Sequence, residues 1–193
     1  MSLISSYFDS IAGEWDSWEL PHRQEKRKAL VRSLSLRKGD KVLDVACGTG
    51  TLTELLAQEV NAPVLGIDIS GKMIEKAKEN HAKNPMVSFV AQDFYTFEGE
   101  GYDAVILFNA YPHFLDVVRL GKAAFHALKR GGIWCILLDE GRNELQSYAA
   151  HRDPTLSRDI ASPLEEALFY HDDFDVIEAK EDCHSYRLIL RKK

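Results

Sequence analysis

Acidic side chains and two glycines lie together in one stretch of the chain, VLDVACGTGTLTELLA (residues 42–57). A short apolar run, then small residues, then apolar residues at helical spacing is typical of a strand, a tight loop and a helix. The first turn of a helix leaves backbone N–H groups unpaired, so such a loop commonly receives a ligand. Gly48 and Gly50 let the backbone approach that ligand closely, and Asp44 adds a carboxylate.

Three classes of ligand compete for this loop. A triphosphate-binding loop needs GxxxxGK[ST], and GTGTLT (residues 48–53) contains no lysine, so that class is excluded. A dinucleotide-binding loop needs GxGxxG, and Thr53 stands where the third glycine belongs. Asp68 does follow at the spacing of a ribose-binding acid, so a nucleotide-dependent oxidoreductase stays open as an alternative.

The third class is a cationic nucleoside without a phosphate. Asp44, Asp68 and Asp93 each lie in or at the end of an apolar run, and three carboxylates around one crevice would repel a pyrophosphate. A sulfonium and an ammonium would be attracted there instead. S-adenosylmethionine carries both groups, together with a ribose diol and an adenine, so the pattern favours this cofactor.

Short apolar runs alternate with helical patterns from residue 41 onward, at residues 41–47, 62–69, 87–93, 102–110 and 131–139. This alternation predicts right-handed crossovers and a doubly wound α/β sheet. Ser70 is placed to cap the helix that follows the second run. The last two runs, 174–181 and 186–193, are separated by a link that permits a hairpin but not a crossover. The sheet is therefore expected to end in an antiparallel pair.

Composition excludes several classes of partner. The 193 residues carry a formal net charge of −6 with scattered basic residues, which argues against a nucleic-acid surface. No apolar stretch approaches the roughly 18 residues of a membrane span, and the N-terminus lacks the pattern of a signal peptide. Cys47, Cys135 and Cys183 show no metal-binding spacing and suit a reducing compartment. We expect a cytoplasmic protein with no metal site and no membrane span.

Five ordered segments resemble those of the class I S-adenosylmethionine-dependent methyltransferases. They are VLDVACGTGTLTELLA, VLGIDISGKMIEKAK, VSFVAQDFYTF, YDAVILFNAYPHF and ALKRGGIWCIL, within residues 40–140. The resemblance implies a Rossmann-like seven-stranded sheet of order 3-2-1-4-5-7-6 with strand 7 antiparallel. The N-terminal YFDSIAGEWDSW is similar to a segment of small-molecule methyltransferases of the ubiquinone and menaquinone biosynthesis type, where it forms helices that cover the cofactor.

The resemblance also implies roles for individual residues. Gly48 and Gly50 would approach the methionine part of the cofactor, and Asp44 would order the loop and the cofactor's amino group. Asp68 would accept from the ribose hydroxyls, and Asp93 from the adenine amino group. The other implied cofactor-site positions are Ala46, where the family most often has a glycine, Thr49, Ile69, Met73, Phe94 beside the adenine, and Asn109 near the reactive methyl.

Methyl transfer needs alignment above all, and a general base helps when the acceptor is an alcohol, a phenol or a carbon acid. His113 and Tyr111, just after the fourth strand, are the first candidates for that base, and His151 beside Arg152 is the second. A plainer alternative is that His113 caps the next helix and His151 is solvated. The sequence NAYP (residues 109–112) lacks the NPPY pattern of amino-group methylation, so we expect a small-molecule acceptor.

We expect one domain over residues 1–193, as a monomer or a homodimer. Its parts are an N-terminal helical lid (1–40), a cofactor-binding core (41–140), a substrate-side variable segment (141–173) and a C-terminal hairpin (174–193). A methyltransferase-like binding module without catalysis stays open as an alternative. The sequence does not identify the methyl acceptor.

Overall fold

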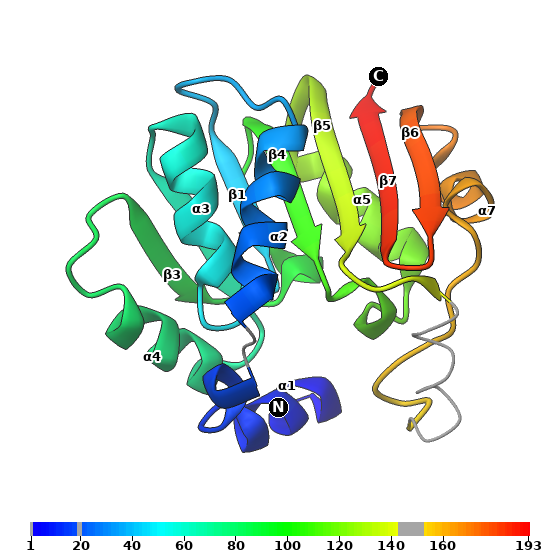
Figure 1. Cartoon of the computed structure of the whole chain (residues 1–193). Coiled ribbons are helices and arrows are strands. Elements are labelled where there is room, and N and C mark those ends of the chain that lie inside the picture. Colours follow the sequence, from blue (N-terminus) through cyan, green and yellow to red (C-terminus); the bar gives the residue numbers. More distant parts are fainter. Residues whose placement is uncertain (1, 19–20, 143–152) are drawn as a thin grey trace. The chain divides into compact units, whose positions relative to one another are not determined.

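The computed structural model describes residues 2–18, 21–142 and 153–193 (Figure 1). The chain divides into two compact units, Met1–Phe94 and Tyr95–Lys193. The strands form a seven-stranded sheet in the order β3-β2-β1-β4-β5-β7-β6, which confirms the predicted order. Their bounds are β1 (Val42–Val45), β2 (Val64–Asp68), β3 (Val87–Ala91), β4 (Tyr102–Phe108), β5 (Leu128–Leu138), β6 (Phe174–Asp182) and β7 (Ser185–Lys192).

The first unit holds three parallel strands and the helices that accompany them. Strand β2 pairs in parallel with both β1 and β3. The helical elements are α1 (Leu3–Ile11), the 3-10 helix η1 (Trp15–Trp18), α2 (Pro21–Ser33), α3 (Thr51–Val60) and α4 (Gly71–Asn80). All four residues of β1 are buried, as expected for a strand inside a covered parallel sheet. The Oγ of Ser70 accepts from the N–H of Met73 at 3.1 Å, which confirms the predicted cap of α4.

The second unit ends in the expected hairpin. Strand β4 pairs in parallel with β5, and β7 is antiparallel to both β5 and β6. Helix α5 (Val117–Ala127) ends directly before β5. Strand β5 begins at Leu128, three residues earlier than the predicted run 131–139. Gly131 has a φ of 75°, and the register of β4 and β5 shifts at this irregular start of β5.

The segment expected to be variable, 141–173, contains a short helix within its described residues. Helix α7 (Pro163–Ala167) is followed by the 3-10 helix η4 (Leu168–Tyr170). Ser162 and Glu165 form a reciprocal capping box, and Pro163 occupies the first turn. The sequence SPLE (residues 162–165) is typical of such a cap, so the start of α7 follows from the local sequence.

The structure gives no support for a membrane span. Every helix within residues 2–18, 21–142 and 153–193 is too short or too polar to cross a bilayer.

Candidate functional site

The glycine loop runs from the end of β1 into α3 with three left-handed residues. The φ angles are 54° at Ala46, 54° at Gly48 and 86° at Gly50. A Cβ on Gly50 would lie 2.6 Å from a ring carbon of Phe89, so this position requires glycine for space as well as for conformation. Ala46 adopts its left-handed backbone at a steric cost that a glycine would not have.

Asp68 joins the glycine loop to the turn after β2. Its Oδ2 accepts from the N–H of Gly48 at 2.9 Å, and its Oδ1 accepts from the N–H of Ser70 at 2.8 Å. The residue is only 7 % exposed, and burial raises the pKa of its carboxyl even though both N–H groups oppose that shift. Each carboxylate oxygen has two lone pairs, so Asp68 retains the capacity to accept from two ribose hydroxyls.

Asp44 lies in β1, the strand that leads into the glycine loop, and is 1 % exposed. Its Oδ2 accepts from the hydroxyl of Thr53 at 2.6 Å. Burial raises the pKa of the Asp44 carboxyl to about 7, and the charge of Asp68 adds to the shift, whereas Thr53 opposes it. Two buried acids therefore interact unfavourably here, and a cation bound nearby would relieve that repulsion.

Helix α1 is attached to the turn between β2 and α4. The Oγ of Ser5 donates to the carbonyl oxygen of Ile69 at 3.2 Å. Asp9 Oδ1 accepts from Ser70 Oγ at 2.6 Å and from the N–H of Lys72 at 3.0 Å. Asp9 thus places a carboxylate at the N-terminal end of α4, where the helix dipole favours negative charge.

The 3-10 helix η1 is attached to the glycine loop itself. Asp16 Oδ1 accepts from the hydroxyl of Thr49 at 2.7 Å, and Asp16 Oδ2 accepts from the side-chain amide of Asn80 at 2.8 Å. The indole nitrogen of Trp15 lies 3.7 Å from the place of a Cβ on Gly48. The predicted role of the segment as a cover over a bound cofactor stays a prediction.

Asp9 and Asp16 were not anticipated from the sequence. Both directly follow an aromatic residue, Phe8 and Trp15, and they are seven residues apart. That repeated aromatic–acid pair is the signal in the sequence that could have identified them.

The other residues expected near the cofactor lie in or beside the same unit's loops. Met73 and Phe94 are buried, at 1 % and 3 % exposure, and Ile69 and Asp93 are half-buried. The roles of Asp93 and Phe94 toward an adenine, and the places of Ile69 and Met73 in the cofactor site, stay predictions.

Asn109 fastens the end of β4 to the end of β5. Its side-chain amide donates to Asp139 Oδ1 at 2.7 Å, and its Oδ1 accepts from the N–H of Asp139 at 3.0 Å. Asn109 also has a left-handed φ of 53°. The residue therefore shapes this loop, and its expected place near the reactive methyl stays a prediction.

Tyr111 is fully buried in the 3-10 helix η3 (Tyr111–His113). Its hydroxyl donates to Glu166 Oε2 at 2.6 Å, and burial raises the pKa of that hydroxyl far above its ordinary value. A hydroxyl in this state does not exchange protons readily with a bound acceptor. The placement favours a structural role for Tyr111 over the role of a base.

His113 is half-buried, with Nδ1 2.8 Å from the carbonyl oxygen of Leu156. The alternative that His113 caps the next helix is wrong, because Asp116 is the cap of α5 and accepts from the N–H of Arg119 at 2.9 Å. His151 and Arg152 lie outside the described residues.

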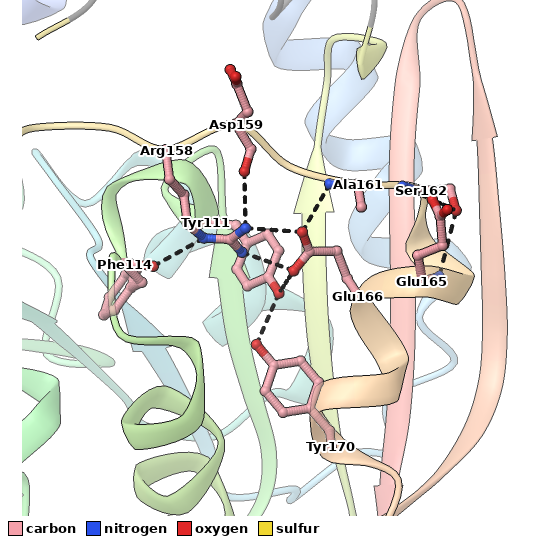
Figure 2. Close-up of polar contacts among 9 residues, drawn as sticks. All are labelled: Tyr111, Phe114, Arg158, Asp159, Ala161, Ser162, Glu165, Glu166 and Tyr170. Atoms are coloured by element: carbon pink, nitrogen blue, oxygen red, sulfur yellow. Dashed lines mark hydrogen bonds and ion pairs between the residues drawn. The ribbon is translucent and has the colours of Figure 1, made fainter. Parts of the chain in front are cut away.

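Arg158 and Glu166 were missed by reasoning from sequence. They form a two-pronged ion pair beside Tyr111, with both N–O distances at 2.9 Å (Figure 2). The sequence pattern around Arg158 and Glu166 does not predict their pairing, because they are eight positions apart and no regular element connects them.

Comparison with known proteins agrees with this geometry. Residues 42–132 match a family model described as a methyltransferase domain. A demethylmenaquinone methyltransferase of Symbiobacterium thermophilum is 33% identical over 129 residues, which are 63% of this chain and 48% of that protein. A protein of the same name from Staphylococcus aureus is 35% identical over 138 residues, 67% of this chain and 57% of that one. The chain thus spans about half the length of the curated relatives it matches.

Solved structures show the same fold. A SAM-dependent methyltransferase from Aquifex aeolicus has a TM-score of 0.76 at 17% identity, covering 96% of this chain and 98% of that one. The N-methyltransferase NodS from Bradyrhizobium japonicum, in complex with S-adenosyl-L-homocysteine, has a TM-score of 0.75 at 17% identity and covers 98% of both chains. Residues 42–132 therefore resemble a methyltransferase domain, and the chain has the fold of S-adenosylmethionine-dependent methyltransferases of known structure.

Proposed function

We propose that this chain transfers a methyl group from S-adenosylmethionine to a small-molecule acceptor. The observation that carries the proposal is the Asp68 carboxylate, which holds the glycine loop through Gly48 and lies close enough to Asp44 to raise its pKa. Two buried acids beside a loop without lysine or arginine fit a cationic cofactor with a ribose diol. They do not fit a pyrophosphate, which argues against the oxidoreductase alternative.

Residues of the first unit would hold the cofactor. Asp68 would accept from the ribose hydroxyls, and Gly48 and Gly50 would keep the loop backbone free of side chains. A cation bound nearby would favour the ionised form of Asp44, and that carboxylate would attract the cofactor's cationic end. Trp15, in the segment attached by Asp16, would exclude water from that end. The bound cofactor supplies an electrophilic methyl group, and the protein supplies alignment.

The acceptor would be taken at the carboxyl end of β4, because ligands of open α/β sheets bind beyond the carboxyl ends of strands. His113 follows β4 there and would take the proton that a phenol or a carbon acid loses when it accepts the methyl. The relatives' names indicate demethylmenaquinone as the acceptor of those proteins. A reduced demethylmenaquinone analogue is therefore the first acceptor to test.

The setting of the reaction is part of the proposal. The net charge of −6 favours a small molecule over nucleic acid. The free thiols of Cys47, Cys135 and Cys183 fit a reducing, cytoplasmic compartment.

Titration calorimetry with S-adenosylhomocysteine, NAD and ATP tests the cofactor. We expect binding of S-adenosylhomocysteine and no measurable binding of NAD or ATP. Tighter binding of NAD than of S-adenosylhomocysteine would contradict the proposal. Transfer of a labelled methyl from S-adenosylmethionine to the reduced quinone analogue then tests the acceptor, and its absence would contradict that acceptor but not the cofactor.

A further inference from the structure

Arg158 fastens the segment 153–161 to the turn that follows β4. Its guanidinium donates two parallel hydrogen bonds to the carboxylate of Glu166, both at 2.9 Å (Figure 2). Its Nε donates to the carbonyl oxygen of Phe114 at 3.2 Å, and its backbone N–H donates to the carbonyl oxygen of Pro112 at 2.9 Å. One residue therefore connects α7 with the backbone on either side of His113.

Glu166 is the centre of this cluster and is 1 % exposed. Besides Arg158, it accepts from the hydroxyl of Tyr111 at 2.6 Å and from the N–H of Ala161 at 2.8 Å. Since the single hydroxyl hydrogen of Tyr111 goes to Glu166, the hydroxyl of Tyr170 donates to Tyr111 at 2.8 Å. Although burial would raise it, these hydrogen bonds hold the pKa of Glu166 below its ordinary value. Removing one partner of such a buried, fully bonded pair is costly.

The fastened segment carries the carbonyl group that meets His113. The N–H of Leu156 donates to the carbonyl oxygen of Asp153 at 2.9 Å, which forms a turn, and the carbonyl oxygen of Leu156 lies 2.8 Å from Nδ1 of His113. A carbonyl oxygen only accepts, so Nδ1 carries the hydrogen. The neutral ring then has its lone pair on Nε2, the nitrogen that would act as the base.

We propose that the Arg158–Glu166 pair is a positioning device for His113. By holding the segment 153–161 against the end of β4, the pair keeps the carbonyl group of Leu156 where it selects the Nδ1–H tautomer and orients the ring. The inference rests on the proposed function, since it gives His113 the base role in methyl transfer. Arg158 and Glu166 act through Leu156 and His113 and do not touch the acceptor.

Long-range ¹H–¹⁵N correlation spectra of the histidine rings test the proposal without an acceptor. The variant His113→Gln assigns the His113 signals among the seven histidines. We expect the Nδ1–H tautomer in the wild-type protein and a shift toward the Nε2–H tautomer in Glu166→Gln, because the loosened segment no longer holds Leu156 in place.

The hairpin offers a matched control. Arg187 donates to Glu178 at 2.9 Å in a similar two-pronged pair between β6 and β7. Glu178→Gln removes one carboxylate of the same kind from the same unit, and we expect it to leave the His113 tautomer unchanged.

A wild-type protein with His113 in the Nε2–H form would overturn the proposal, as would a folded Glu166→Gln protein with the wild-type tautomer. If Glu166→Gln does not fold, Arg158→Lys carries the test, because lysine keeps the charge but loses the two-pronged geometry. In Arg158→Lys we expect the His113 ring to shift toward the Nε2–H tautomer, and an unchanged tautomer overturns the proposal.

Kinetics separate this inference from the proposed function. On an accepted quinol analogue, Glu166→Gln should lower kcat by about tenfold or more, part of what a general base contributes. Its affinity for S-adenosylhomocysteine should stay within about twofold of wild type, since Glu166 contacts none of the residues expected to hold the cofactor. A wild-type protein that fails to bind S-adenosylhomocysteine contradicts the proposed function, whereas an unshifted tautomer contradicts the positioning role alone.

Discussion

The hydroxyl of Thr53 in α3 donates a 2.6 Å hydrogen bond to Asp44 in β1, and both residues are buried. Thr53 stands where a dinucleotide-binding loop carries its third glycine, which serves close packing of helix on strand. In this chain the same position supplies a hydrogen-bond donor to a buried carboxylate. The first turn of α3 therefore packs against a buried acid, Asp44, beside the glycine loop. This arrangement favours a cationic ligand over a phosphate.

The Asp44 carboxyl should make stability depend on pH. Burial raises its pKa from 3.8 to about 7 in the folded chain, so the folded state holds a proton that the unfolded state releases first. Between about pH 4 and pH 7 the free energy of unfolding should therefore fall as the pH rises, and the loss is complete above that range. Asp44→Asn removes this contribution, worth on the order of 2–4 kcal/mol.

Urea unfolding of both proteins at a series of pH values checks this sign. Relative to the Asn variant, the wild-type protein should lose stability as the pH rises from about 4 to about 8. Parallel stability curves for the two proteins would show that Asp44 is ionised throughout.

Asp68 should serve both the cofactor and the loop. Asp68→Ala leaves the N–H groups of Gly48 and Ser70 without their carboxylate, so we expect a folded protein of reduced stability. Its affinity for S-adenosylhomocysteine should fall by about 1–3 kcal/mol, the range for losing charge-assisted hydrogen bonds. Asp68→Asn keeps one acceptor oxygen, so its affinity for S-adenosylhomocysteine should lie between those of the wild-type protein and Asp68→Ala. Calorimetry and urea unfolding measure these effects, and an unchanged affinity in Asp68→Ala would mean that the ribose role is misassigned.

The N-terminal segment should close over the bound cofactor. Hydrogen exchange in residues 2–18 should slow when S-adenosylhomocysteine is added, because α1 and η1 are attached to the loops that the ligand orders. Asp16→Ala should remove most of that protection, since it breaks the contact with Thr49. Glu14→Ala, an exposed acid in the same segment, is the matched control. Identical exchange with and without ligand would count against a lid.

His113→Ala should lower turnover by roughly 10²–10⁴-fold while cofactor affinity stays intact, because only the proton acceptor is lost. His126→Ala is the control, since His126 lies exposed in α5 and contacts the carbonyl oxygen of Glu98. Suppose His113→Ala shows full activity on an acceptor that the wild-type protein methylates. Then no general base is needed, and alignment of acceptor and cofactor accounts for catalysis.

Much of this fold could be predicted from the sequence because it depends on interactions between residues close together in the chain. Alternation of apolar runs and helical patterns predicted the parallel strands. The four-residue link at 182–185 between the last two predicted runs indicated the hairpin, because so short a link cannot form a crossover. Ser70 was recognisable as a cap because its partner, Met73, is three residues away. The glycines of the cofactor loop were recognisable because their left-handed backbone is a local steric requirement.

Only the tertiary structure decided which polar groups distant in sequence meet. Asp68 reaches Gly48 across 20 positions, Asp16 reaches Thr49 across 33, and Tyr111 reaches Glu166 across 55. Periodicity carries no information about such pairs, because their partners depend on which strand ends and turns the sheet brings together. For the same reason Tyr111, a candidate base by its position after β4, is a buried donor, whereas His113, two residues later, keeps a ring whose tautomer is set by a carbonyl group 43 positions away.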